Sequence, residues 1–247
     1  MVLAHGLTDS HACWTRVIAH LVARHEVVAY DARGHGDSSA PDTGDAPDAP
    51  ALDLVALVDA LGLERPALVG HSMGAVTVAV AAALLGDRCR AAVLEDPPMR
   101  GDATNRAGRP VRYSGWSEWR ERVQRRCRLT PDELLAECRD ELANWHPDDR
   151  AGWVEAQAAV DPGVFDAPHE MYADWYRHLD RVACPVLIIT GEPERGCLLS
   201  AADLDRLRRQ ARDARVARIP GAGHSVRRDR FEAYWAAVDA FLSELRA

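Results

Sequence analysis

The segment Gly70-His71-Ser72-Met73-Gly74 constrains the fold of this chain more than any other. It follows a short apolar run at residues 66–69 and precedes a helical run of small residues at 75–85. Glycines lack Cβ atoms, so they let the backbone turn tightly between a strand and a helix while Ser72 is pushed outward. Free N–H groups at the start of that helix favour a negative charge developing nearby. The segment therefore predicts a serine nucleophile at a strand-to-helix turn.

Short apolar runs alternate with helical patterns along most of the 247 residues, which predicts parallel strands joined by crossover helices. Strands are expected at residues 1–4, 26–30, 66–69, 91–95, 185–190 and 215–219. Helices are expected at residues 11–24, 51–61, 75–85, 201–212 and 228–245. The pattern predicts an α/β fold with a mostly parallel, doubly wound sheet.

The segment from residue 97 to about residue 183 breaks this alternation, because it lacks a convincing β-run and has helical patterns at 116–128, 131–145 and 169–179. We expect residues 97–183 to form a helical cap, inserted between two strands of a core made by residues 1–96 and 184–247. Some tryptophans of the cap are expected to contact substrate, while others hold the cap to the core. Five of the seven tryptophans lie there: Trp116, Trp119, Trp145, Trp153 and Trp175.

Composition excludes several classes of function. The net charge is −8 without a basic block, which argues against nucleic acid or anionic lipid as the main partner. All thirty basic residues are arginine, so Schiff-base, P-loop and Ser-Lys chemistry cannot be built. No apolar run reaches membrane-spanning length and no signal peptide is recognisable, so we expect a soluble, cytoplasmic protein. Six scattered cysteines without a C-x-x-C pair are expected to be reduced and mostly buried.

A serine nucleophile needs a neighbouring base, and His224 is the best candidate. It lies in the glycine-rich segment 220–225, after the last expected strand and before the final helix. Such a loop brings an imidazole over the carboxyl edge of the sheet, where open α/β folds bind ligands. We therefore expect the hydroxyl of Ser72 and the imidazole of His224 to meet at hydrogen-bonding range.

Attack on a carbonyl leaves an oxyanion, which needs preorganised hydrogen-bond donors. The backbone N–H of Met73, directly after the nucleophile, is one expected donor. The other is the N–H of Leu7, because Gly6 lets the loop after the first strand double back. The side chain of Leu7 is expected to line the pocket.

The remaining histidines have other expected roles. His71 should point away from Ser72 and serve packing or hydrogen bonding, and His35 should belong to a structural loop in which Arg33 pairs with aspartates. A metal site built from His5, His71 and His224 is conceivable, but no pair of these residues has metal-ligand spacing. We therefore expect no metal and no cofactor.

Together these motifs resemble the α/β-hydrolase superfamily. The resemblance covers nearly the whole chain and rests on His5-Gly6, the loop Arg33-Gly34-His35-Gly36-x-Ser38, Gly70 to Gly74, the helical insertion and Gly223-His224. It implies that Ser72 is the nucleophile and His224 the general base, beneath a lid. Members usually begin with a hairpin before the strand at which this chain starts. Without it, an exposed edge strand could support a homodimer.

The resemblance leaves two candidates for the acid of the triad. Many members carry it after the strand expected at 185–190, where Glu194 stands in Gly191-Glu192-Pro193-Glu194. Others, including some lactonases and haloalkane dehalogenases, carry it after the preceding strand, where Asp96 stands. The shorter side chain on a proline-stiffened turn favours Asp96, and Glu194 stays the alternative.

The leading hypothesis is a cofactor-free serine hydrolase that cleaves an ester or lactone of a small, largely apolar molecule through an acyl-enzyme. One alternative is a non-hydrolytic enzyme of the same fold, acting by C–C bond cleavage, cyclisation or cofactor-free peroxide chemistry. Another is a ligand-binding receptor module that signals through its lid.

Overall fold

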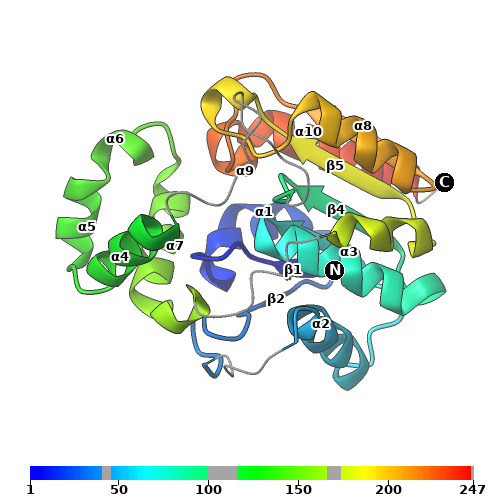
Figure 1. Ribbon diagram of the computed structural model, residues 1–247, viewed down its shortest axis with the longest axis horizontal. Helices are drawn as coiled ribbons and strands as arrows, with labels where there is room; N and C mark the ends of the chain where they lie inside the picture. The colour runs from blue at the N-terminus through cyan, green and yellow to red at the C-terminus, as the bar shows by residue number, and fades with distance from the viewer. Residues whose placement is uncertain (41–45, 100–115, 166–173, 246–247) are drawn as a thin grey trace.

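The computed structural model describes residues 1–40, 46–99, 116–165 and 174–245. A sheet of six strands lies at its centre (Figure 1). The strand order is β2-β1-β3-β4-β5-β6, and every pair of neighbours is parallel. The strands are β1 (Val2–Ala4), β2 (Val28–Tyr30), β3 (Ala67–His71), β4 (Ala91–Glu95), β5 (Val186–Thr190) and β6 (Ala214–Arg218). The predicted parallel α/β fold is confirmed.

The strand order places the loops that follow β1, β3 and β4 side by side. From β1 the chain moves outward to β2 and returns to β3 on the other side of β1, so the order switches between β1 and β3. The register pairs Ala4 with Gly70 and His71 with Glu95. The loop after β1 and the turns after β3 and β4 therefore begin together at the carboxyl edge, where open α/β sheets bind ligands.

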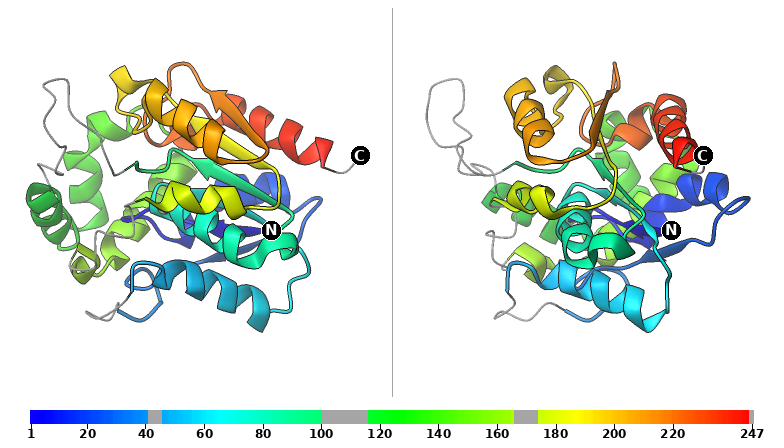
Figure 2. Two further views of the ribbon diagram at one scale, coloured as in Figure 1. Left: turned by 45° about the vertical axis from the view of Figure 1, so that its right-hand side comes forward. Right: turned by 90° about the vertical axis from the view of Figure 1, so that its right-hand side faces the viewer.

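Helices cover both faces of the sheet, as the alternation of buried side chains requires (Figure 2). Leu68 and Ile188 pack in one apolar cluster with α2 (Ala49–Ala60), α3 (Met73–Leu85) and α8 (Ala201–Gln210). Their strand neighbours Val69 and Ile189 pack in the other with α1 (Thr15–Leu21) and α10 (Phe231–Glu244). The sheet therefore forms the middle of three layers.

Two glycines of the β3–α3 turn allow close backbone packing. A Cβ atom on Gly74 would lie 2.1 Å from the carbonyl oxygen of Ala4, and one on Gly70 would lie 2.2 Å from that of Gly74. Because backbone atoms form both obstacles, no side-chain movement could relieve them. The helix that follows Ser72 thus packs directly on β1.

The segment between β4 and β5 contributes a group of helices at the left of Figure 1. They are α4 (Trp116–Arg126), α5 (Pro131–Glu137), α6 (Arg139–Leu142) and α7 (Pro147–Ala159). Leu134, Cys138, Leu142 and Trp153 form a small apolar core of their own. We call these four helices the cap.

The cap is attached to the core through α7. The carbonyl of Thr8, in the loop after β1, accepts a hydrogen bond from the buried Gln157 side chain at 2.8 Å. Arg16 on α1 pairs with Asp149 at 3.1 Å. A Cβ atom on Gly152 would lie 2.3 Å from the carbonyl oxygen of Ala12, so α7 packs closely on the 3₁₀ turn His11–Trp14.

Several predicted elements have different boundaries. The predicted helix 11–24 is the turn His11–Trp14 followed by α1, and the predicted helix 131–145 breaks at Cys138 into α5 and α6. The predicted helix 228–245 is α9 (Val226–Asp229) followed by α10, because the backbone leaves helical geometry at Arg230, whose φ is −144°. Residues 169–173 of another predicted helix lie outside the described residues, and 175–181 form a 3₁₀ helix.

The edge strands of the sheet are β2 and β6, and β1 lies inside it. Pairing of two copies through such an edge stays a prediction.

Replacing Gly74 by alanine should lower the free energy of unfolding by about 3 kcal/mol, because the methyl group would overlap a fixed carbonyl. Gly62→Ala is the control: nothing lies within 4 Å of its Cβ position, so only its φ of +60° should cost about 1 kcal/mol. Urea denaturation followed by circular dichroism measures both. Equal losses in the two variants would contradict the close packing of α3 on β1.

Candidate active site

Ser72 occupies a strained position between β3 and α3. Its φ is 53° and its ψ is −117°, in the half of backbone space that non-glycine residues rarely adopt. Its N–H donates to the carbonyl of Glu95 at 2.9 Å, and its carbonyl accepts from Ala75 and Val76 in the first turn of α3. The hydroxyl does not cap α3. The fold thus fixes the backbone of Ser72 and leaves its hydroxyl unused by the helix.

Asp96 follows β4 and holds the ring of His224. Its carboxylate is fully buried, and Oδ2 accepts a hydrogen bond from His224 Nδ1–H at 2.7 Å. The N–H of Leu198 donates to the same oxygen at 2.8 Å, and the hydroxyl of Thr190 donates to Oδ1 at 2.7 Å. These donors fix the direction of the carboxylate. Because Nδ1 carries the proton, the lone pair of His224 lies on Nε2.

Glu194 lies elsewhere. It is exposed in the short turn Pro193–Arg195, and His224 makes its carboxylate contact with Asp96. The neighbouring Glu192 accepts the N–H of Gly221 at 2.9 Å and so supports the loop that carries His224. Of the two acids left open by the sequence, the structure brings Asp96 to the histidine.

His224 lies near the turn that carries Ser72. The ring of His224 lies against that of His71, the residue directly before Ser72, with centroids 4.8 Å apart. The side chain of His224 is 34% exposed whereas that of Asp96 is 0% exposed, so only the histidine is accessible to a ligand. Within the described chain, no hydrogen bond joins the Ser72 hydroxyl to His224. Catalytic hydrogen bonds of this kind often tighten only when substrate binds.

The loop after β1 holds the N–H of Leu7 in a defined direction. The carbonyl of Gly6, in the same peptide group, accepts from the N–H of Asp9 at 3.0 Å and from His5 Nδ1–H at 2.8 Å. Since C=O and N–H of one peptide point oppositely, the N–H of Leu7 faces away from both donors. His35 Nε2–H donates to the carbonyl of Leu7 itself. Among described residues, neither this N–H nor that of Met73 donates to another group, so both are available as donors to a ligand.

A buried charged cluster lies beneath these loops: Asp9, His71, Glu95, Arg227 and Arg228. Arg227 donates to Glu95 and to Asp9, each at 3.1 Å, and Arg228 donates to Asp9 at 2.9 Å. Each member lies close in sequence to a predicted site residue. His71 and Glu95 directly precede Ser72 and Asp96, Asp9 follows Leu7 by two positions, and the two arginines follow His224 by three and four positions. Sequence reasoning missed Asp9, Glu95 and both arginines. The two adjacent arginines shortly after His224 were the sequence signal that could have indicated this cluster.

The cluster changes the pKa values of its members. Burial alone would raise the pKa of the Asp9 carboxyl, but the charges of Arg228 and Arg227 oppose burial, and the pKa lies well below its usual range. Burial, followed by the charge of Arg227, holds the pKa of His71 well below its usual range. His71 Nε2–H donates to the carbonyl of His224 at 3.2 Å. His71 therefore acts as a neutral hydrogen-bonding residue, in line with its predicted role.

Four of the five cap-segment tryptophans have described side chains, and they serve different contacts. Trp175 is buried, and its Nε1–H donates to the carbonyl of Pro98 at 2.7 Å. Trp153 belongs to the cap core, and Trp119 packs edge-on against Phe165. Trp145 contacts the segment behind His224. The side chain of Trp116 lies outside the described residues. Contact of any of them with substrate stays a prediction.

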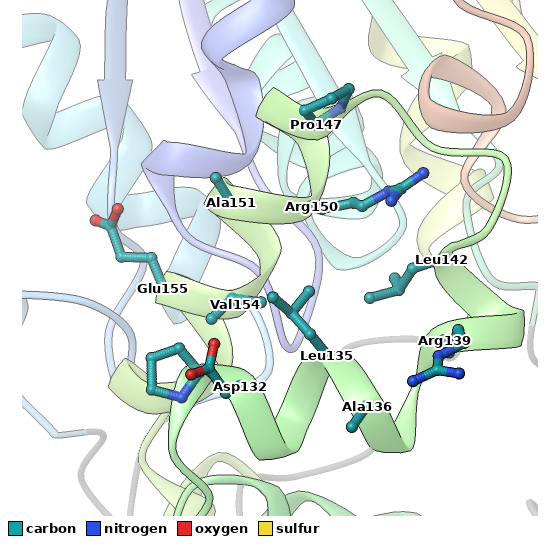
Figure 3. Close-up of a pocket in the computed structure, with 11 residues that line it drawn as sticks. Asp132, Leu135, Ala136, Arg139, Leu142, Pro147, Arg150, Ala151, Val154 and Glu155 are labelled. Carbon is teal, nitrogen blue, oxygen red and sulfur yellow. The ribbon is translucent and has the colours of Figure 1, made fainter.

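The cap has a groove of about 810 Å³ between α5, α6 and α7 (Figure 3). Leu135 on α5 and Val154 on α7 line it from facing helices, and Arg139 and Arg150 lie at its α6 side. None of its lining residues belongs to the site around Ser72. The groove is therefore separate from the catalytic arrangement.

The alternative of a metal site finds no support in the described part of the chain. His5 uses both ring nitrogens, since Nδ1–H donates to Gly6 and Nε2 accepts the N–H of Ala32 at 2.9 Å. No group of three or more His, Cys, Asp or Glu residues in that part could hold a metal ion. All six cysteines are free. A helix long and apolar enough to cross a membrane is likewise not found among the described residues.

Comparison with known proteins identifies the family of this chain. Residues 1–237 match the model of the alpha/beta hydrolase family, and the chain belongs to this family. It is 30% identical to the N-formylmaleamate deformylase of Pseudomonas putida, over 98% of this chain and 88% of that one. It is 29% identical to the 2-(acetamidomethylene)succinate hydrolase of Mesorhizobium japonicum, over 92% of this chain and 81% of that one.

A solved structure of E-2-(acetamidomethylene)succinate hydrolase superposes with a TM-score of 0.80. The identity is 26%, and the alignment covers 98% of this chain and 91% of that one. These relatives are hydrolases, and hydrolysis is the class of chemistry that the comparisons support.

His5 should make stability depend on pH. Burial lowers the pKa of His5 to about 3, so the folded protein keeps it neutral while the unfolded chain protonates it near pH 6.5. Its contribution to stability is complete above pH 6.5 and is lost as the pH falls toward 3. Between pH 7 and pH 5, wild type should lose about 2 kcal/mol more than His5→Gln, whose amide oxygen can still accept from Ala32. Urea denaturation at both pH values measures this, and parallel losses would contradict it.

Arg227 and Glu95 should be coupled in their effect on stability. Arg227→Met leaves the carboxylate of Glu95 buried without a cation, which should cost about 3–5 kcal/mol of unfolding free energy. Adding Glu95→Gln removes that charge, keeps an oxygen for the N–H of Arg227, and should recover about 2 kcal/mol. Denaturation curves of wild type, both single variants and the double variant measure the coupling. A double variant less stable than Arg227→Met would refute it.

Proposed function

We propose that this protein is a serine hydrolase that works through an acyl-enzyme, with Ser72 as nucleophile, His224 as general base and Asp96 as the acid that orients it. The observation that carries the proposal is the 2.7 Å hydrogen bond from His224 to a carboxylate with no exposure to solvent. That bond lies at the sheet edge where Ser72 adopts a strained turn. Strain at a non-glycine residue is typical of functional positions.

The proposed reaction has two halves. Ser72 Oγ attacks the substrate carbonyl while His224 Nε2 accepts the hydroxyl proton, and the N–H groups of Leu7 and Met73 stabilise the oxyanion. Collapse of this intermediate expels the leaving group, which takes the proton from His224. Water then attacks the acyl-serine by the reverse route, with His224 again as the base. Asp96 stabilises the imidazolium in both halves.

For the bond that is cleaved, we propose an ester or lactone of a small, largely apolar molecule as the first candidate. A second candidate is an acylated nitrogen, because the deformylase and the acetamido hydrolase similar to this chain are both named for such substrates. Both candidates use the same three residues, since an amide leaving group asks only that His224 protonate a nitrogen.

Ser72→Ala should lower kcat by about 10⁴-fold or more without unfolding the protein, because the acyl-enzyme can no longer form. Asp96→Asn should lower kcat by about 10⁴-fold, because the amide favours the wrong tautomer of His224. Glu194→Gln is the matched control and should change kcat less than twofold. Steady-state kinetics on one substrate compare all three. A collapse in Glu194→Gln, with Asp96→Asn unaffected, would overturn the assignment of the acid.

The substrate class is tested by a panel of p-nitrophenyl esters, lactones, N-formyl compounds and acetamides, with mass spectrometry of Ser72 after a fluorophosphonate. Turnover of esters or lactones supports the first candidate, and turnover of the nitrogen compounds alone supports the second. A labelled Ser72 with no hydrolysis in the panel would favour non-hydrolytic chemistry. A ligand-dependent change in hydrogen exchange of the cap, without turnover, would favour a receptor.

A further inference from the structure

One residue of the cap reaches the segment that carries the catalytic histidine. Trp145 lies in the turn between α6 and α7, and its Nε1–H donates to Oδ1 of Asp229 at 3.0 Å. The guanidinium of Arg228 lies 4.7 Å from the centre of the same ring. Both contacts are with α9, which begins two residues after His224. An indole that donates its N–H and stacks on a cation makes a directed contact.

The second oxygen of Asp229 holds the backbone next to His224. Asp229 Oδ2 accepts a hydrogen bond from the N–H of Gly223 at 2.7 Å. Gly223 cannot carry a side chain, because its Cβ atom would lie 2.4 Å from the carbonyl oxygen of Arg195. On the other side, the carbonyl of His224 accepts from His71 at 3.2 Å. The backbone around the imidazole is therefore held at both ends.

Trp145 is itself held firmly within the cap. Arg150 on α7 donates to the carbonyls of Trp145 and Ala143, each at 2.9 Å, and so fixes the turn. Trp153 lies edge-on to the ring of Trp145, with centroids 6.3 Å apart. The Nε1–H of Trp145 thus reaches Asp229 from a fixed turn.

We propose that Trp145 and Asp229 are positioning residues that couple the docking of the cap to the placement of His224. Asp229 needs both partners to keep one orientation: Trp145 on Oδ1 and Gly223 on Oδ2. Loss of the Trp145 donor frees the carboxylate, loosens Gly223, and lets His224 leave its productive position. This inference rests on the proposed role of His224. It gives Trp145 a role in the rate of the chemical step.

The test compares wild type with Trp145→Phe, Asp229→Ala and Asp229→Asn, and with Trp235→Phe on α10 as the matched control. Trp145→Phe keeps an apolar ring beside Arg228 and removes only the N–H donor. The rate constant for labelling of Ser72 by a fluorophosphonate, kinact, should fall about 3- to 10-fold in Trp145→Phe. It should fall about 10- to 100-fold in Asp229→Ala. KI should change less than twofold in both, and Trp235→Phe should match wild type.

Two further measurements separate positioning from general damage. Hydrogen exchange of the peptide that covers residues 221–224 should speed up in Trp145→Phe and Asp229→Ala, while thermal melting shows both variants folded. In the double variant Trp145→Phe/Asp229→Ala, kinact should equal that of Asp229→Ala, because the tryptophan acts only through the carboxylate. If the alanine variant does not fold, Asp229→Asn replaces it, and its kinact should lie below that of wild type because the amide keeps only one oxygen.

Three results would overturn the inference: unchanged exchange at 221–224 in Trp145→Phe, additive losses in the double variant, or a change in KI with kinact unaltered. The last would indicate that Trp145 contacts the ligand. Failure of the proposed function is distinguishable, because it would show as an unlabelled Ser72 in wild type. The exchange measurement would then still decide whether Trp145 controls the loop of His224.

Discussion

The relative placement of the loops around the proposed site depends on the buried ion pairs that Arg227 makes with Glu95 and Asp9. A guanidinium with 1% exposure has lost its water, and only a full set of charged partners compensates for that loss. Arg227 finds those partners on two different segments, the end of β4 and the loop after β1. Burying the cation elsewhere would be costly, so these segments must meet where the guanidinium lies. The ion pairs therefore define one relative placement of the loops that carry the proposed catalytic groups.

The proposed chemistry lies on one side of these segments and the ion pairs lie on the other. Along β4, Glu95 turns toward Arg227 while the next residue, Asp96, turns toward His224. At the end of β3, His71 supports the carbonyl of His224 while Ser72 begins the turn. Ser72 and Asp96 both have a positive φ, 53° and 42°, so the chain turns sharply directly after each strand ends. In each pair, the last strand residue belongs to the buried cluster, while the residue at the turn belongs to the proposed triad.

Much of this could be predicted from the sequence, because the decisive signals are local. A strand, a Gly-x-Ser-x-Gly turn and a helix of small residues are contiguous, so the placement of Ser72 needed no knowledge of distant contacts. The choice between Asp96 and Glu194 could not be made that way. It depends on Thr190 and Leu198, which orient the Asp96 carboxylate from the end of the neighbouring strand β5 and the loop after it. The contacts of Arg227 and Trp145 could not be predicted for the same reason. An arginine is usually assigned to the solvated surface, and a tryptophan is usually assigned to apolar packing.

The small core of the cap has a consequence for how such a protein changes over time. Leu134, Cys138, Leu142 and Trp153 hold α5, α6 and α7 together. Attachment of the cap to the loops and helices of the core uses Gln157, Asp149 and Trp145. Substitutions on the outer surfaces of α4 and α5 can therefore accumulate without altering the machinery below. The turn at Trp145 has no such freedom. Among related proteins that act on different substrates, we expect the sequence of that turn to vary least and the sequences of the surrounding helices to vary more.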